Sequence, residues 1–164
     1  MSLELSRERS HDLWTEIRPL LIEHKGEISF YPDIELAPDI PAYEQAEDVG
    51  LLRCYVARLH GQMVGYAIFF VKYNMHYSHS LQAVQDVLFV TKPHRHGRVG
   101  VQLIRYATEQ LRAEQVQVEY QHVKATAQIR AALAALMARS DVGALMEKLG
   151  YELIDLIYGK RLDR

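Results

Sequence analysis

The segment Asp86–Gly100 combines a carboxylate, an apolar run and several basic residues in an order that suits anion binding. The run Val87–Val90 is rich in β-branched and aromatic residues, which predicts a strand, and Pro93 ends it. A basic, glycine-containing loop over 91–97 follows, and apolar residues then recur at helical spacing from Val99. A strand that turns through such a loop into a helix offers free backbone N–H groups and a positive dipole end to an anion.

Hydrophobic periodicity predicts the elements around this segment, and Pro19 should kink or split the first helix. The hairpin that precedes the loop requires antiparallel pairing, whereas the strand–helix–strand crossover requires a parallel pair. We therefore expect an α/β (α+β) fold with a mixed, mainly antiparallel central sheet and helices on both faces. The expected helices are 10–25, 41–48, 98–114, 125–138 and 141–149, and the expected strands are 51–59, 63–73, 81–90, 116–123 and 151–162.

Length and composition favour one domain over residues 1–164. The net charge of −2 argues against broad nucleic-acid affinity, which needs a basic face. No apolar run approaches the roughly 20 residues that span a bilayer, and the N-terminus lacks a secretory pattern. The single cysteine, Cys54, cannot form an internal disulfide and is expected to be buried. These features together predict a cytoplasmic protein with neither a nucleic-acid nor a membrane partner.

The sequence resembles the GCN5-related N-acetyltransferase (GNAT) family from about residue 51 to residue 162. The family's acyl-CoA signature is R/Q-x-x-G-x-G/A, after a strand that ends in V-x-P. Here Val90–Pro93, which reads V-T-K-P, lies at the strand end, and Arg95–Gly100 supplies the signature. Ala144–Tyr151 is similar to the family's L-Y-x-K-x-G-F segment. The stretches H-Y…Q-D-V-L-F-V and Y-x-K-R-L look most like the phage-type subgroup of the family.

The resemblance implies an acetyl-CoA-dependent N-acetyltransferase that acts on a primary amine of a small molecule or protein. Asp86 is similar to the family's strand carboxylate that serves as general base, and Tyr158 or Tyr120 would be the general acid. The remaining residues that the resemblance assigns are cofactor-binding: Leu88, Phe89 and Val90 along the pantetheine arm, and Arg95, His96, Gly97, Arg98, Val99 and Gly100 at the pyrophosphate.

Two departures from the family pattern keep an alternative open. Arg98 stands at the signature's central glycine, and Met146 stands where the family has a tyrosine that protonates the leaving thiolate. The alternative is a non-catalytic relative that binds CoA or a partner protein. Asp86 could likewise be a polar residue that only forms hydrogen bonds within its strand. A module that reads nucleic-acid phosphates through Arg95 and its basic neighbours is a third interpretation, which the overall acidity disfavours.

The stretch 26–50 has no Lys or Arg and two interpretations remain for its charge. It is either a solvated acidic loop or a wall that attracts a cationic acceptor. Eight histidines are present, but no His-x-x-x-His pair falls on an expected helix, so we expect no metal. The alternating C-terminal strand could pair across a homodimer. The acidic side chains of the stretch are Glu27, Asp33, Glu35, Asp39, Glu44, Glu47 and Asp48.

Overall fold

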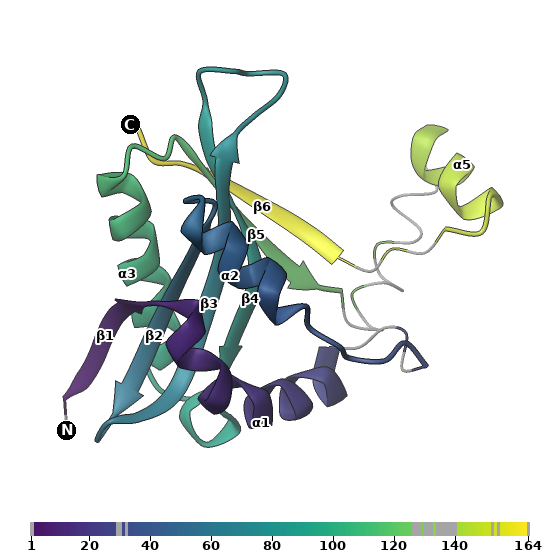
Figure 1. Ribbon diagram of the computed structural model, residues 1–164. Coiled ribbons are helices and arrows are strands. Elements are labelled where there is room, and N and C mark those ends of the chain that lie inside the picture. Colours follow the sequence, from purple (N-terminus) through teal and green to yellow (C-terminus); the bar gives the residue numbers. More distant parts are fainter. Residues whose placement is uncertain are drawn as a thin grey trace. The chain divides into compact units, whose positions relative to one another are not determined.

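The computed structural model describes residues 2–28, 31, 33–125, 129, 133, 141–151, 153 and 155–163. Its described helices and strands follow one another along the chain in the order that the periodicity predicts, with one additional strand at the start (Figure 1). The elements are β1 (Leu3–Glu8), α1 (Ser10–Ile28), α2 (Ile40–Asp48), β2 (Leu52–Leu59), β3 (Gln62–Tyr73), β4 (Leu81–Val90), the 3₁₀ turn η1 (Lys92–His94), α3 (Val99–Ala113), β5 (Val118–Lys124), α5 (Asp141–Lys148) and β6 (Asp155–Arg161).

The sheet has six strands in the order β1-β2-β3-β4-β5-β6. Neighbouring strands from β1 to β4 are antiparallel, because tight connections join β2 to β3 and β3 to β4. The β4 and β5 strands are parallel, and α3 provides the crossover between them. The predicted mixed, mainly antiparallel sheet is confirmed.

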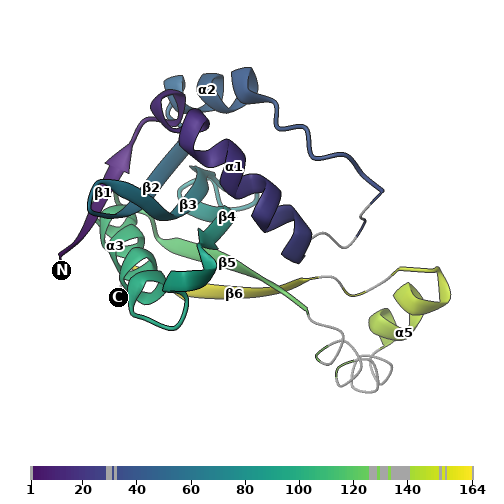
Figure 2. The same ribbon diagram turned by 90° about the horizontal axis from the view of Figure 1, so that it is seen from below.

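Helices cover both faces of this sheet, and each face has its own core (Figure 2). On one face, α3 buries residues that recur every three or four positions against aliphatic side chains of β2, β3 and β4. On the other face, α1 and α2 pack against a more aromatic cluster. The buried residues of α3 are Val99, Leu103, Ala107, Thr108 and Leu111.

The strand at Leu3–Glu8 was missed, and of the two outcomes expected at Pro19 the split is wrong, while the kink stays a prediction. The segment Leu3–Glu8 was not predicted as a strand, yet it pairs along its whole length with β2. Four of its six residues are charged or polar, so it has little apolar pattern and depends on an edge position. Pro19 does not split α1, which is one helix across that position, because Leu13 and Ile17 bury its face on the sheet.

The chain divides into two compact units, residues 1–121 with 159–164, and residues 122–158. The first unit holds β1–β4, α1–α3 and the candidate site described below. In the second unit, α5 ends as predicted at Gly150, whose positive φ of 83° favours glycine. The predicted helix over 125–138 lies outside the described residues, apart from 125, 129 and 133.

Candidate functional site

A β-bulge places Asp86 outside the regular ladder of β4. Ile68 on β3 pairs with Val87, whereas the next residue, Phe69, pairs with Gln85, so Asp86 is the extra residue. Asp86 and Val87 therefore both point to the face covered by α1 and α2, which carries Val87 in its core. The alternation that would have put Asp86 on the face of Leu88 and Val90 holds only without a bulge.

The β4 backbone is open on the side of β5 beyond the bulge. The register between β4 and β5 ends at the pair Val84–Tyr120. The Thr91 N–H donates to the Val64 carbonyl at 2.9 Å, so the adjacent Gly65–Val90 pair is of the non-hydrogen-bonded kind. In such a pair the peptide groups point away from the partner strand. The N–H and C=O of Val90, and those of Leu88 two residues earlier, therefore face away from β3.

The Asp86 carboxylate has a tyrosine partner that the sequence did not reveal. The Tyr43 hydroxyl, on α2, donates to Asp86 Oδ2 at 2.6 Å. Burial raises the pKa of Tyr43 above its usual range, and the hydrogen bond to Asp86 adds to this effect. Tyr43 is therefore a proton donor across the physiological pH range, and α2 holds the carboxylate on the α1–α2 face.

A second tyrosine lies within electrostatic reach of Asp86. Burial raises the pKa of Tyr66 above its usual range, and the negative charge of Asp86 raises it further. The Tyr66 hydroxyl is buried and has no hydrogen-bond partner within the described part of the chain. Its ring lies 5.8 Å from that of Phe89, so it belongs to the aromatic core beneath Asp86. No pattern in the sequence indicates that α2 and β3 bring tyrosines close to one carboxylate.

The loop after β4 becomes a short 3₁₀ turn, and α3 then begins at Val99. Arg98 is the N-cap residue and makes no side-chain capping bond, so the free N–H groups of the first turn of α3 are not blocked by it. Neither Gly97 in the loop nor Gly100 in α3 is required by the protein's own packing. A Cβ would be 3.7 Å from the nearest atom at Gly97 and also at Gly100, an ordinary contact distance.

Two loop cations are paired with carboxylates near the end of α1. Arg95 Nη2 lies 2.6 Å from Glu27 Oε2 and 3.7 Å from Glu23 Oε1, and Lys92 Nζ lies 3.2 Å from Glu27 Oε1. The hydrogen bond from Arg95 lowers the pKa of Glu27 below its usual value. The side chain of Arg95, predicted to contact a pyrophosphate, is thus engaged within the protein.

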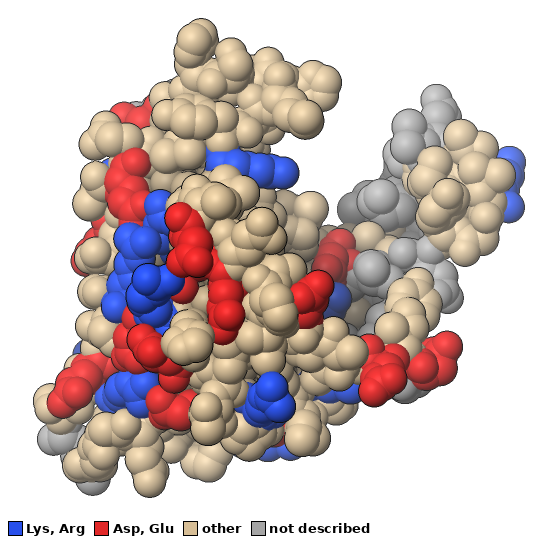
Figure 3. Space-filling view, viewed as in Figure 1, with Lys and Arg blue, Asp and Glu red and all other residues tan. Residues whose placement is uncertain are grey.

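Most carboxylates of the acidic stretch 26–50 have a partner within the protein, which favours the solvated-loop interpretation of its charge. Figure 3 shows red and blue side chains next to one another on the face that carries α1 and α2. Arg9 pairs with both Glu47 and Asp48, and Asp39 caps α2 by accepting from the Ala42 N–H. Five of the seven carboxylates form a hydrogen bond or an ion pair: Glu27, Asp39, Glu44, Glu47 and Asp48.

The structure places the predicted tyrosines on different strands. Tyr120 pairs with Val84, two residues before Asp86. Its neighbour Glu119 accepts from Thr108 of α3, so Tyr120 points to the opposite face, the one that carries Asp86. Tyr158 lies on β6 in the second unit and is 60% exposed. Met146 lies on α5 in the same unit and is 37% exposed.

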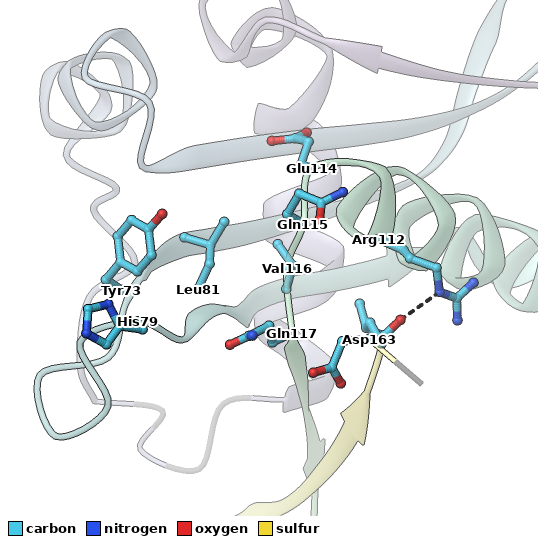
Figure 4. A pocket seen from close by; sticks show the side chains of 10 residues that line it. Tyr73, His79, Leu81, Arg112, Glu114, Gln115, Val116, Gln117 and Asp163 are labelled. Carbon is cyan, nitrogen blue, oxygen red and sulfur yellow. Dashed lines mark hydrogen bonds between the residues drawn. The ribbon is translucent and has the colours of Figure 1, made fainter.

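Figure 4 shows a pocket at the other end of β4, near Leu81. Its volume is about 580 Å³, and the Arg112 guanidinium donates to the Leu162 carbonyl at its edge. None of its lining residues belongs to the Asp86 bulge or the basic loop. In the described ranges, no cluster of three His, Cys, Asp or Glu residues could hold a metal ion. Among the same residues, no helix is long and apolar enough to cross a membrane.

Comparison with known proteins relates this chain to one family. The sequence model of the acetyltransferase (GNAT) family matches residues 12–137, which is more than half of the chain. No curated protein gives a significant match.

Several solved structures have a similar fold. The GNAT-family acetyltransferase of Streptococcus pneumoniae is 15% identical with a TM-score of 0.64, covering 98% of this chain and 99% of that one. The PaiA N-acetyltransferase of Thermoplasma acidophilum, in complex with coenzyme A, is 14% identical with a TM-score of 0.59 and the same coverage. The ribosomal-protein-alanine N-acetyltransferase of Brucella melitensis is 21% identical with a TM-score of 0.59, covering 96% and 99%. Identities this low establish the fold alone.

Proposed function

Because the chain belongs to the acetyltransferase (GNAT) family, we propose that it transfers an acetyl group from acetyl-CoA to a primary amine of a small molecule or protein. The observation that carries the proposal is the bulge at Asp86, next to an open strand edge and just ahead of the start of α3. These features supply, in one unit, a carboxylate, exposed peptide groups and free helix N–H groups. The PaiA structure with coenzyme A is a precedent for CoA binding on this fold.

The open edge of β4 suits the thioester and the pantetheine arm. The peptide groups of Leu88 would pair with a pantetheine amide in the manner of an added strand. The Val90 N–H would polarise the acetyl carbonyl as the tetrahedral intermediate forms. The N–H groups of His96 to Gly100 would bind the pyrophosphate at the start of α3. Phe89 would support the pantetheine site indirectly, because its ring lies in the aromatic core under α1.

Asp86 would accept the proton that the amine must lose before attack. A lysine-like amine has a pKa of about 10.4, so its neutral form costs roughly 4–5 kcal/mol at neutral pH. The hydrogen bond from Tyr43 fixes the carboxylate on the face where Tyr120 also lies. For the general acid we propose Tyr120 ahead of Tyr158, because Tyr120 belongs to the strand next to β4 and shares a face with Asp86. The coenzyme A thiolate also leaves readily without an acid.

The acceptor class follows from what surrounds Asp86. The carboxylates of α2, Glu44, Glu47 and Asp48, are each engaged by Arg9 or His11, so none of them is a free ligand for an amine. We therefore propose an acceptor that is recognised by one carboxylate and by the aromatic side chains of Trp14 and Tyr43. A primary amine on an apolar or aromatic small molecule, or on a protein chain, fits this description better than a polycation.

The decisive experiment measures acetyl-CoA binding by titration calorimetry and then thiol release over a panel of amines. General-base catalysis contributes about 10²–10⁴-fold, so Asp86→Asn should lower kcat at least a hundredfold and leave the CoA Kd unchanged. Turnover that survives Asp86→Asn would overturn the base assignment. Tyr120→Phe and Tyr158→Phe, compared under the same conditions, test the acid.

A non-catalytic CoA- or partner-binding protein is the second candidate, and Met146 at the usual tyrosine position favours it. It predicts CoA binding without thiol release for any amine. The likeness to the phage-type subgroup, the single domain over 1–164, the cytoplasmic location and a homodimer stay predictions, as does the absence of nucleic-acid, membrane and metal partners.

A further inference from the structure

The guanidinium of Arg95 connects three parts of the first unit. Its Nε donates to the Val90 carbonyl at 2.7 Å, and its carbon lies 5.5 Å from the centre of the Phe89 ring. Its Nη2 forms the 2.6 Å contact with Glu27 at the last turn of α1. The Val90 carbonyl faces away from β3, so the sheet does not satisfy it and Arg95 does. The arginine therefore fixes the end of β4 to α1.

The same contacts reduce the positive charge that the loop can offer to an anion. Lys92 and Arg95 carry two positive charges, and Glu23 and Glu27 bring two negative charges within 4 Å of them. Arg98 is different. It is exposed at the start of α3, and within the described part of the chain its side chain has no hydrogen bond or ion pair. The free cation of the loop is thus next to the free N–H groups.

We propose that Arg95 is a positioning residue, held by Glu27 across the Val90 carbonyl, and that Arg98 supplies the charged contact to the phosphates of acyl-CoA. The second half rests on the proposed function. Arg98, at the signature's glycine position, then makes the ionic contact to the phosphates, because the guanidinium of Arg95 is paired with Glu27 on α1. Arg95 fixes the Val90 carbonyl at the end of β4, and the Thr91 N–H of the same peptide group is held by Val64 of β3.

The first half is tested on the protein without ligand, by thermal unfolding of Arg95→Gln, Glu27→Gln and the double variant. Each single variant should lower Tm by about 2–4 °C, and the double variant should lower it no further than the larger single effect. Arg95→Lys should lose as much as Arg95→Gln, because an ammonium lacks the planar fork that reaches both partners. Glu109→Gln, an exposed carboxylate on α3, is the matched control and should leave Tm unchanged. Additive effects of Arg95→Gln and Glu27→Gln would overturn the proposal that Glu27 holds Arg95 in position.

The second half is tested by CoA binding at several salt concentrations. Arg98→Gln should raise the Kd for CoA about tenfold and weaken its salt dependence, because a charge-assisted contact to phosphate is lost. The Kd for pantetheine, which lacks the phosphates, should not change. Arg95→Gln should change the salt dependence little. Arg105→Gln is the control for removing a positive charge from α3 and should leave the CoA Kd within about twofold of wild type.

The opposite pattern, with the salt dependence lost in Arg95→Gln and kept in Arg98→Gln, would overturn the assignment. Failure of the wild-type protein to bind CoA would instead refute the proposed function. The unfolding measurements do not use CoA, so they would still decide whether Glu27 holds Arg95 in position.

Discussion

Replacement of Gly100 by alanine should separate the stability of the fold from its proposed ligand binding. Gly100 is the second residue of α3, and an added Cβ would meet its nearest atom, Val90 Cγ2, at 3.7 Å. That distance is an ordinary contact, so nothing in the protein opposes the methyl group. Alanine is favoured over glycine inside a helix by up to about 1 kcal/mol, and near the helix start we take about half of that. For a chain of this length the gain corresponds to a Tm about 1–2 °C higher.

Binding of CoA should not change. Gly100 stands at the last position of the signature, where the family has either glycine or alanine, so a methyl group there leaves room for the pyrophosphate at the first turn of α3. A hydrogen bond to a charged group contributes about 1.5–3 kcal/mol, so a displaced phosphate contact would raise the Kd at least about tenfold, whereas the Kd of Gly100→Ala should stay within about twofold of wild type. Calorimetry with CoA and thermal unfolding of the free protein give the two readouts.

Gly26 on α1 offers a matched control for the same chemical change. A Cβ at Gly26 would have no atom within 4 Å, so Gly26→Ala should keep CoA binding unchanged. A Gly100→Ala protein that binds CoA at least tenfold more weakly than wild type would refute the idea that Arg95–Gly100 binds CoA as the family signature does. A large loss of Tm in Gly100→Ala would show that the packing argument is wrong.

Three further predictions concern the scaffold. Gly65→Ala should destabilise the protein by about 1–3 kcal/mol in urea unfolding and weaken CoA binding, because its Cβ would lie 2.9 Å from a backbone oxygen of β4. Arg58→Gln should cost about 2 kcal/mol in the same assay, since it leaves the carboxylates of Glu8 and Glu16 without their shared cation; a loss below about 0.5 kcal/mol would contradict this. Hydrogen bonds from arginine lower the pKa values of Glu8, Glu16 and Glu27 below the ordinary 4.5. The contribution of these carboxylates to the free energy of unfolding is therefore complete above pH 4.5 and is lost as the pH falls through the lowered pKa values. The Tm should stay level down to about pH 5 and drop below it, and the drop should be smaller in Arg58→Gln.

Periodicity was a sufficient guide to most of the fold. The strands around the turn at Gly61, the strand before the basic loop and the helix after it were predicted within a few residues, because their apolar patterns are strong. The strand β1 escaped, since its pairing with β2 comes from position at an edge and not from its own composition.

The site was harder to predict than the fold. Alternation puts Asp86 on the face of Leu88 and Val90 only if no bulge intervenes, and the one extra residue that makes the bulge leaves no mark in a hydrophobic pattern. The partners of Asp86 and Arg95 are Tyr43 and Glu27, which lie far away in sequence. A list of charged residues cannot show which of them neutralise one another, so the loop appeared more cationic in sequence than it is in space.

The bulge in β4 also bears on how such a protein could lose its chemistry during evolution. Gln85 pairs with Phe69 and Val87 pairs with Ile68, and these partners are consecutive on β3. Deletion of the single codon for Asp86 would therefore join Gln85 to Val87 in a regular ladder, with the pairing on either side unchanged. The proposed base would disappear while the strands, both cores and the loop stayed in register. One in-frame deletion thus separates a catalyst of this design from a scaffold that only binds.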